Sequence, residues 1–148
     1  MTPTQTPILT GRDIGQAEHA VRAVLDRLLD RAGLTYPQWT ILFTIDAAGP
    51  LARDELARRQ AAGLQVPAAE AEATVDGLVS SGLVAPVDGG PALGFSAAAE
   101  AVFRPARQEV ARLTGVLYGD LPRADLEATQ RTLAEITRRA NAHLATSR

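Results

Sequence analysis

The sequence predicts a mainly α-helical protein that carries one small β-hairpin, and three observations support this fold class. Apolar residues recur at three- and four-residue intervals in several segments, which is the spacing of an amphipathic helix. Two short extended segments flank the dipeptide Asp88-Gly89, a common turn signal of hairpins. The chain has 148 residues, of which 46% are hydrophobic, so it can bury the core of about one domain.

The first two predicted helices follow an arm over residues 1–11 that shows little periodicity. The first helix runs from Asp13 to Arg31. Its apolar stripe consists of Ile14, Ala17, Val21, Val24, Leu25 and Leu28. The second helix lies within residues 34–49, with Pro37 in its first turn, and it is apolar enough to be buried on most sides.

The middle of the chain predicts two further helices and the hairpin. Residues 50–63 contain a short extended piece and then a helix from about Arg53. The next helix is opened by Pro67 and closed by Gly82. The strands of the hairpin then occupy residues 83–87 and 92–96.

Two long helices are predicted at the C-terminal end. Ser96 provides an N-cap for a helix over residues 97–118, and a turn over residues 119–125 follows. The last helix carries the apolar residues Leu126, Leu133, Ile136, Ala140 and Leu144. Narrow apolar stripes at the two ends of the chain are hard to bury in one globule, whereas a second copy of the chain would cover them. The sequence therefore predicts a homodimer.

The composition excludes several function classes. The chain contains no cysteine, which excludes disulfides, thiolate catalysis and zinc sites built on thiolates. Its net charge of −2 gives no overall attraction to nucleic acid or to acidic membranes, so any anion binding has to be local. There is no visible signal peptide and no apolar run of roughly 18 residues, so a soluble cytoplasmic protein without a membrane partner is expected.

Five segments resemble, in order and in approximate spacing, the signature segments of the MarR family of bacterial winged-helix regulators. Four of them are LTYPQWTIL, LARDELARR, ATVDGLVSSGLV and LGFSAAAEAVF. The fifth, LYGDLPRADLEATQRTLAEITRRANAHLA, resembles the C-terminal dimerisation helices of actinobacterial members. The resemblance extends over about residues 12–145, which is nearly the whole chain.

The resemblance implies a single MarR-like domain over residues 1–148. Within it, residues 12–33 and 97–147 form dimerisation helices, and residues 34–96 form a winged helix-turn-helix lobe. It also implies a homodimeric DNA-binding transcriptional regulator, a repressor, whose DNA affinity responds to a small aromatic or anionic ligand. In the family that ligand lies between the dimerisation helices and the lobe.

Two features depart from the family pattern. The segment between the two lobe helices is a few residues longer than the usual tight turn, and it lacks the Ser/Thr cluster that normally opens the recognition helix. The wing is degenerate, because the stretch VDGGPA replaces an acidic and arginine-containing pattern whose arginine enters the minor groove.

The predicted recognition helix has an acidic outer face. Its buried stripe is Ala71, Val75, Leu78 and Val79. The residues left to face base edges are Ala69, Glu70, Ala73 and Asp76, with Gly77, Ser80 and Glu72 beside them. The phosphate contacts that supply most affinity fall to Arg53, Arg58 and Arg59. Residues 50–96 carry these three arginines against six acids, a net charge of −3, so weak DNA binding is expected.

Two function classes therefore stay open beside the leading one. The first alternative is a MarR-fold dimer that has lost DNA binding and serves as a small-molecule-binding or biosynthetic accessory protein. An enzyme on this scaffold is less favoured, because no serine, histidine or carboxylate constellation points to a catalytic residue. No metal ion or cofactor is implied by any motif.

Six residues are candidates for contact with a ligand. Tyr36, Trp39 and Phe43 fall near the pocket that the resemblance implies and offer stacking surfaces, although a core position is the simpler interpretation of Trp39 and Phe43. Arg104 and Arg107 are candidates for an anionic head group, with a surface salt network as the alternative. His19 lies on the polar side of the first helix, where a solvated imidazole is the simpler interpretation.

Overall fold

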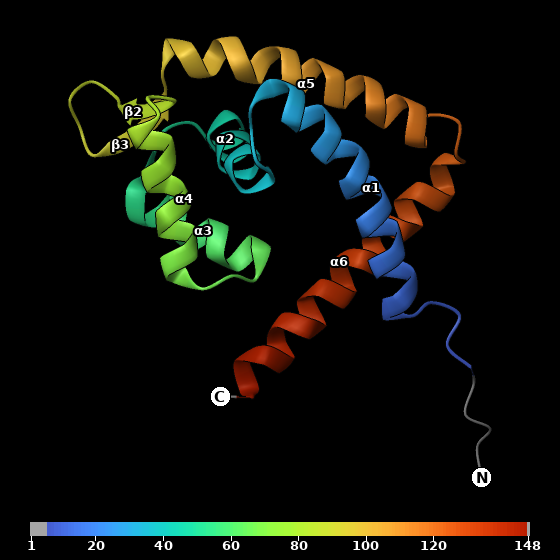
Figure 1. Cartoon of the computed structure of the whole chain (residues 1–148). Helices are drawn as coiled ribbons and strands as arrows, with labels where there is room; N and C mark the ends of the chain where they lie inside the picture. The colour runs from blue at the N-terminus through green and yellow to red at the C-terminus, as the bar shows by residue number, and fades with distance from the viewer. Residues whose placement is uncertain (1–5, 148) are drawn as a thin grey trace. The chain divides into compact units, whose positions relative to one another are not determined.

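The computed structural model describes residues 6–147, which form six helices and one three-stranded sheet (Figure 1). In chain order the elements are α1 (Gly11–Ala32), α2 (Tyr36–Ala48), β1 (Leu51–Ala52), α3 (Arg53–Leu64), α4 (Ala68–Ser80), β2 (Val84–Pro86), β3 (Ala92–Phe95), α5 (Ala97–Tyr118) and α6 (Arg123–Thr146). The chain divides into two compact units, the first ending at Val110 and the second starting at Ala111 within α5. The mainly helical fold with a small hairpin is confirmed.

Side-chain caps set the starts of the first two helices. The Thr10 amide and hydroxyl both donate to the Asp13 carboxylate, at 2.8 and 2.7 Å, so α1 begins two residues earlier than its apolar spacing predicts. At α2, the Gln38 amide N–H donates to the Thr35 hydroxyl, and the Thr35 N–H donates to the Gln38 side chain. Pro37 occupies the first turn of α2, as predicted.

The connection between α3 and α4 is short, which corrects the expectation of a long turn. The helix α3 continues to Leu64, so only residues 65–67 separate it from α4. Gln65 has a φ of 54°, and the Val66 N–H donates to the Ala61 carbonyl at 3.1 Å, which closes the end of α3. The additional residues therefore lengthen α3, because their alanine-rich sequence favours helix.

A buried glutamine fixes α3 against α2. Gln60 is 5% exposed, and its side-chain N–H donates to the Pro37 carbonyl at 2.9 Å. The Thr40 hydroxyl donates to the other end of the same amide at 2.9 Å. Both polar ends of the buried side chain are thus satisfied, which removes the cost of burying them.

The sheet has the order β1-β3-β2, and all its pairs are antiparallel. In the predicted hairpin turn, Asp88 and Gly89 have φ values of 52° and 68°, as a turn of this sequence requires. The third strand, β1, pairs Leu51 with Leu93 and was predicted only as an extended piece. The Ser96 hydroxyl accepts the Ala99 N–H at 3.1 Å and caps α5, as predicted.

The core of the first unit lies between α2, α3, α4, the sheet and the start of α5. Phe103 on α5 is completely buried, with ring centroids 5.0 Å from Trp39 and 5.1 Å from Phe95. The prediction that α2 is buried on most sides holds at Trp39, Ile41, Leu42 and Ile45, whereas Phe43 is 41% exposed and the helix end at Ala47 and Ala48 is exposed as well. Of the predicted stripe on α1, Leu28 is buried and Leu25 packs against the core as a half-buried residue, and Leu29, which lies outside that stripe, is completely buried.

The second unit consists of the end of α5 and of α6. No described residue of α6 is buried, although the helix has a clear apolar stripe. The exposed large apolar residues from α5 onward are Val116, Tyr118, Leu121, Leu133, Ile136 and Leu144. Within the described residues no helix is long and apolar enough to cross a bilayer.

Candidate nucleic-acid interface and ligand pocket

The helix α4 turns one face into the core and the other to solvent. Ala71, Val75 and Leu78 are completely buried, and Val79 packs against them as a half-buried residue. The opposite face is exposed along its length and carries Ala69, Glu70, Glu72, Ala73, Asp76, Gly77 and Ser80. The structure therefore places the four predicted base-facing residues on one open surface, and their contact with DNA stays a prediction.

Arg53 and Asp76 form an ion pair that joins α3 to α4. Arg53 is the first residue of α3, and Asp76 lies on the exposed face of α4. Their side chains are 47% and 53% exposed, so the pair lies at the surface. A cation predicted to contact phosphate thus already has a carboxylate partner within the chain.

Glu55 binds the other two arginines of α3. Both of its oxygens accept hydrogen bonds from Arg58, at 2.7 and 2.5 Å from Nη2, and Oε1 accepts one from Arg59 Nε at 2.7 Å. The hydrogen bonds from Arg58 and then from Arg59 lower the pKa of Glu55 below its ordinary value. One carboxylate therefore forms ion pairs with two guanidinium groups.

The lobe has no unpaired arginine in its described residues. Each of its three arginines faces a carboxylate, whereas Asp54, Glu70, Glu72 and Asp88 have no cationic partner within the described chain. Neither α3 nor α4 has a side-chain cap, so the first amide groups of both helices still offer donors to an anion. The surface that would face DNA is therefore acidic, and its cations are internally neutralised.

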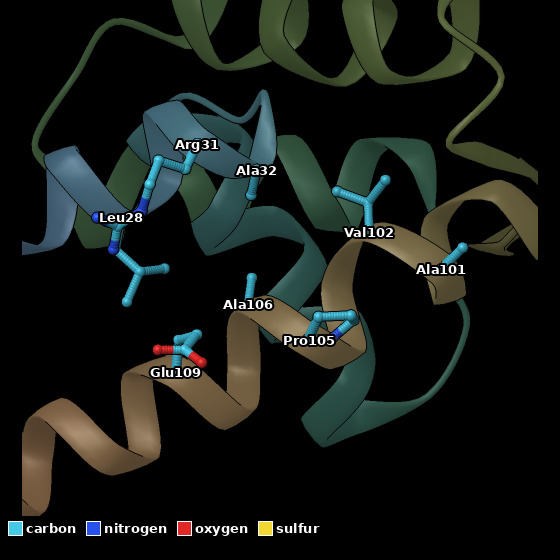
Figure 2. Close-up of a pocket in the computed structure, with 8 residues that line it drawn as sticks. All are labelled: Leu28, Arg31, Ala32, Ala101, Val102, Pro105, Ala106 and Glu109. Carbon is cyan, nitrogen blue, oxygen red and sulfur yellow. The ribbon is translucent and has the colours of Figure 1, made fainter.

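A cavity of about 490 Å³ lies between α1 and α5 within the first unit. Figure 2 shows the α1 residues on one side of the gap and the α5 residues on the other. The lining consists of Leu28, Arg31, Ala32, Ala101, Val102, Pro105, Ala106 and Glu109. Most of these side chains are apolar, and one arginine and one glutamate lie among them, which is the common make-up of a small-molecule site.

Arg31 gives this cavity an available cation. It is exposed, and within the described residues it makes no ion pair. Pro105 lies inside α5 and has no N–H, so the carbonyl of Ala101 lacks its usual helical donor. The cavity thus combines apolar walls with the guanidinium of Arg31 and the carboxylate of Glu109.

The aromatic residues predicted as ligand contacts do not line this cavity. Trp39 is 5% exposed and packs between Phe43 and Phe103, so it is a core residue in this structure. Tyr36 is half-buried beneath the guanidinium of Arg22, 3.3 Å from the ring centroid. The contact of Tyr36, Trp39 and Phe43 with a ligand stays a prediction.

The charged candidates form a surface network. Arg104 donates to Glu100 at 2.7 Å and to Asp46 at 3.4 Å, and Glu100 raises its pKa. Arg107 also approaches Asp46 at 3.4 Å, and it lies over the ring of Phe43 at 4.7 Å. The salt network considered as the alternative is thus present.

His19 lies apart from the other ligand candidates. Its side chain is 84% exposed, and the only ion-pair partner in the described residues is Glu18 at 3.7 Å. Within residues 6–147 no three histidine, aspartate or glutamate side chains gather as metal ligands do.

Glu109 was expected at the mouth of a pocket, beside Arg104 and Arg107, but the other residues that line the cavity were not predicted from the sequence. In the sequence, Leu28 and Ala106 look like ordinary core positions of two different helices. They lie 78 residues apart, and no local pattern indicates that their helices pack together. The one available hint was Pro105 inside an otherwise helical segment, because an internal proline often marks a functional irregularity.

Comparison with known proteins supports the fold at low sequence identity. No protein-family model and no curated protein matches the sequence. Among solved structures, NadR in complex with 4-hydroxyphenylacetate has a TM-score of 0.69 and 22% identity, covering 92% of this chain and 98% of that one. CouR, a transcriptional repressor bound to p-coumaroyl-CoA, has a TM-score of 0.67 and 24% identity, covering 88% and 92%. The Mycobacterium tuberculosis MarR-family protein Rv2887, in complex with DNA, has a TM-score of 0.65 and 20% identity, covering 89% and 98%.

The helix order, the three-stranded sheet and these matches define a winged-helix protein. More particularly, the chain has the MarR-type winged-helix fold, as the sequence resemblance predicts.

Proposed function

We propose that the protein is a homodimeric MarR-type transcriptional regulator, a repressor, that binds duplex DNA weakly and responds to a small anionic aromatic ligand. The observation that carries the DNA-binding part is the open outer face of α4 on a lobe of the same fold as DNA-bound Rv2887. The proposal places Ala69, Glu70, Ala73 and Asp76 at the base edges. Arg53, Arg58 and Arg59 contact phosphates.

The charge of the lobe sets the strength of this binding. A dimer brings six arginines to the duplex, and each neutralised phosphate contributes about −0.9 to the slope of log K against log salt. Every one of these arginines has to exchange a carboxylate for a phosphate, which leaves little net gain. Affinity then depends on the helix N-termini and on the fit of the α4 face.

Capture of fragmented genomic duplex by the purified protein tests the DNA-binding part. Sequencing of the bound fragments at low and at physiological salt is expected to show enrichment of one palindromic site. Replacing Arg58 and Arg59 together by alanine should weaken binding to that site. Unchanged binding by the double variant would overturn the assignment of these arginines.

The ligand part of the proposal uses the cavity between α1 and α5. Its apolar walls accept an aromatic ring, and Arg31 binds the carboxylate of the same molecule. The neighbour NadR is described with 4-hydroxyphenylacetate, which has this chemistry and serves as a first probe.

Trp39 is the single tryptophan, and it reports on such binding because its ring lies 5.0 Å from that of Phe103 on α5. Quenching by 4-hydroxyphenylacetate or by other aromatic acids supports the ligand assignment. Unchanged emission and no calorimetric signal with every acid tested would contradict it.

The paired arginines favour a second candidate function, in which a MarR-fold dimer binds a ligand and does not bind DNA. A lobe with a net charge of −3 and no unpaired arginine has little long-range attraction for a polyanion. This candidate predicts no duplex capture even at low salt, together with intact ligand binding. The same capture experiment therefore separates the two functions.

A further inference from the structure

Two carboxylates form ion pairs with the three exposed arginines of α3. Asp76 pairs with Arg53, and this is the one ion pair between α3 and α4 in the described residues. Glu55 pairs with Arg58 and Arg59. Both carboxylates lie on the lobe itself, so each is present at a fixed, high local concentration whenever DNA approaches.

The position of Asp76 distinguishes it from an ordinary helix-surface acid. It stands on the exposed face of α4 beside Ala73 and Glu72, whereas Arg53 begins the preceding helix. An ion pair within one helix, such as Glu55 with Arg59, contributes to that helix alone. The Asp76–Arg53 pair instead spans the two helices that a duplex would contact together.

We propose that Asp76 and Glu55 compete with DNA phosphate for the arginines of the lobe, and that this competition lowers the affinity of the lobe for duplex DNA. This inference rests on the proposed DNA-binding function. A phosphate reaches Arg53 only by displacing Asp76, and the displaced carboxylate then stays beside the phosphate, where the like charges repel. The two carboxylates therefore act against binding twice, by occupying the cation and by repelling the anion.

Neutralising Asp76 tests this competition. The variant Asp76→Asn keeps the shape of the side chain but frees Arg53, and it should bind a random-sequence duplex on the order of tenfold more tightly per protomer at about 0.1 M salt. Freed arginine also makes the salt dependence steeper, by about 0.9 per protomer. Glu55→Gln provides an independent variant that frees Arg58 and Arg59.

The matched control is Glu72→Gln. It removes the same charge from the same helix, but Glu72 has no cationic partner in the described residues, so no arginine is freed. The second control is Arg53→Ala, combined with Asp76→Asn in a double-mutant cycle. If Asp76 acts through Arg53, the gain from Asp76→Asn disappears in the Arg53→Ala background.

The outcomes separate this inference from the proposed function. Tighter binding by Asp76→Asn than by Glu72→Gln, lost without Arg53, supports the competition even if the wild-type protein captures no genomic site. Equal gains from Asp76→Asn and Glu72→Gln overturn the competition, and capture of a genomic site by the wild type then leaves the proposed function standing. Absence of duplex binding by wild type and by both freed variants at low salt overturns both.

Discussion

Replacing Arg31 by alanine should weaken the binding of an aromatic carboxylate without changing the fold. Arg31 is the cation of the cavity between α1 and α5, its side chain is exposed, and it makes no ion pair within residues 6–147. A hydrogen bond to a charged group contributes about 1.5–3 kcal/mol, and solvent places this one at the lower end of that range. A loss of about 1.5 kcal/mol corresponds to an increase of about tenfold in Kd.

Isothermal titration calorimetry with 4-hydroxyphenylacetate measures this change, and Trp39 emission provides a second readout. Arg27→Ala is the matched control, because Arg27 is an exposed arginine one turn earlier on α1 and does not line the cavity. The methyl ester of the acid should bind the wild type as weakly as the acid binds Arg31→Ala. Equal affinities of wild type and Arg31→Ala, or an equal loss in Arg27→Ala, would refute the role of Arg31.

Three further predictions follow from other parts of the structure. Replacing Leu133 and Ile136 by glutamate places charges on the exposed stripe of α6, so sedimentation should show monomers where the wild type sediments as the proposed dimer. Gln60→Leu removes both hydrogen bonds that fix α3 to α2, while the Thr40 hydroxyl still donates to the Pro37 carbonyl, so denaturant unfolding should show a loss of about 1 kcal/mol. Arg138 and Arg139 lower the pKa of Glu135 from 4.5 to about 2, so its stabilising contribution is present above pH 4.5 and is lost as pH falls through about 2. Glu135→Gln should flatten that part of the acid transition when helicity is followed by circular dichroism, and an unchanged transition would contradict the assignment.

Local signals were sufficient to predict most elements of the fold. Ser96 caps α5, Asp88-Gly89 forms the hairpin turn, and Pro37 opens α2, each because the residue's own backbone preference or hydrogen bonding decides the structure there. The inward and outward faces of α4 followed from its apolar spacing for the same reason.

Features that depend on distant partners were not predictable from the sequence. The pairing of β1 with β3 involves two residues, Leu51 and Ala52, which are too few to form a strand pattern. The cavity requires α1 to lie against α5, and Arg53 requires α3 to lie against α4 before it can meet Asp76. The charges of the lobe can be counted from the sequence, but which charges form ion pairs cannot be predicted from it.

The salt dependence of duplex binding decides whether the α3–α4 surface binds DNA weakly. At low salt the wild-type protein should bind its captured palindrome measurably but weakly. The slope of log K against log salt should be no steeper than about −5.4, which is the limit for the six lobe arginines of a dimer at about −0.9 each. No binding at the lowest salt, or a slope steeper than these arginines allow, would contradict this. The α3–α4 surface would then not be a weak DNA-binding surface whose arginines are paired with carboxylates of the same lobe.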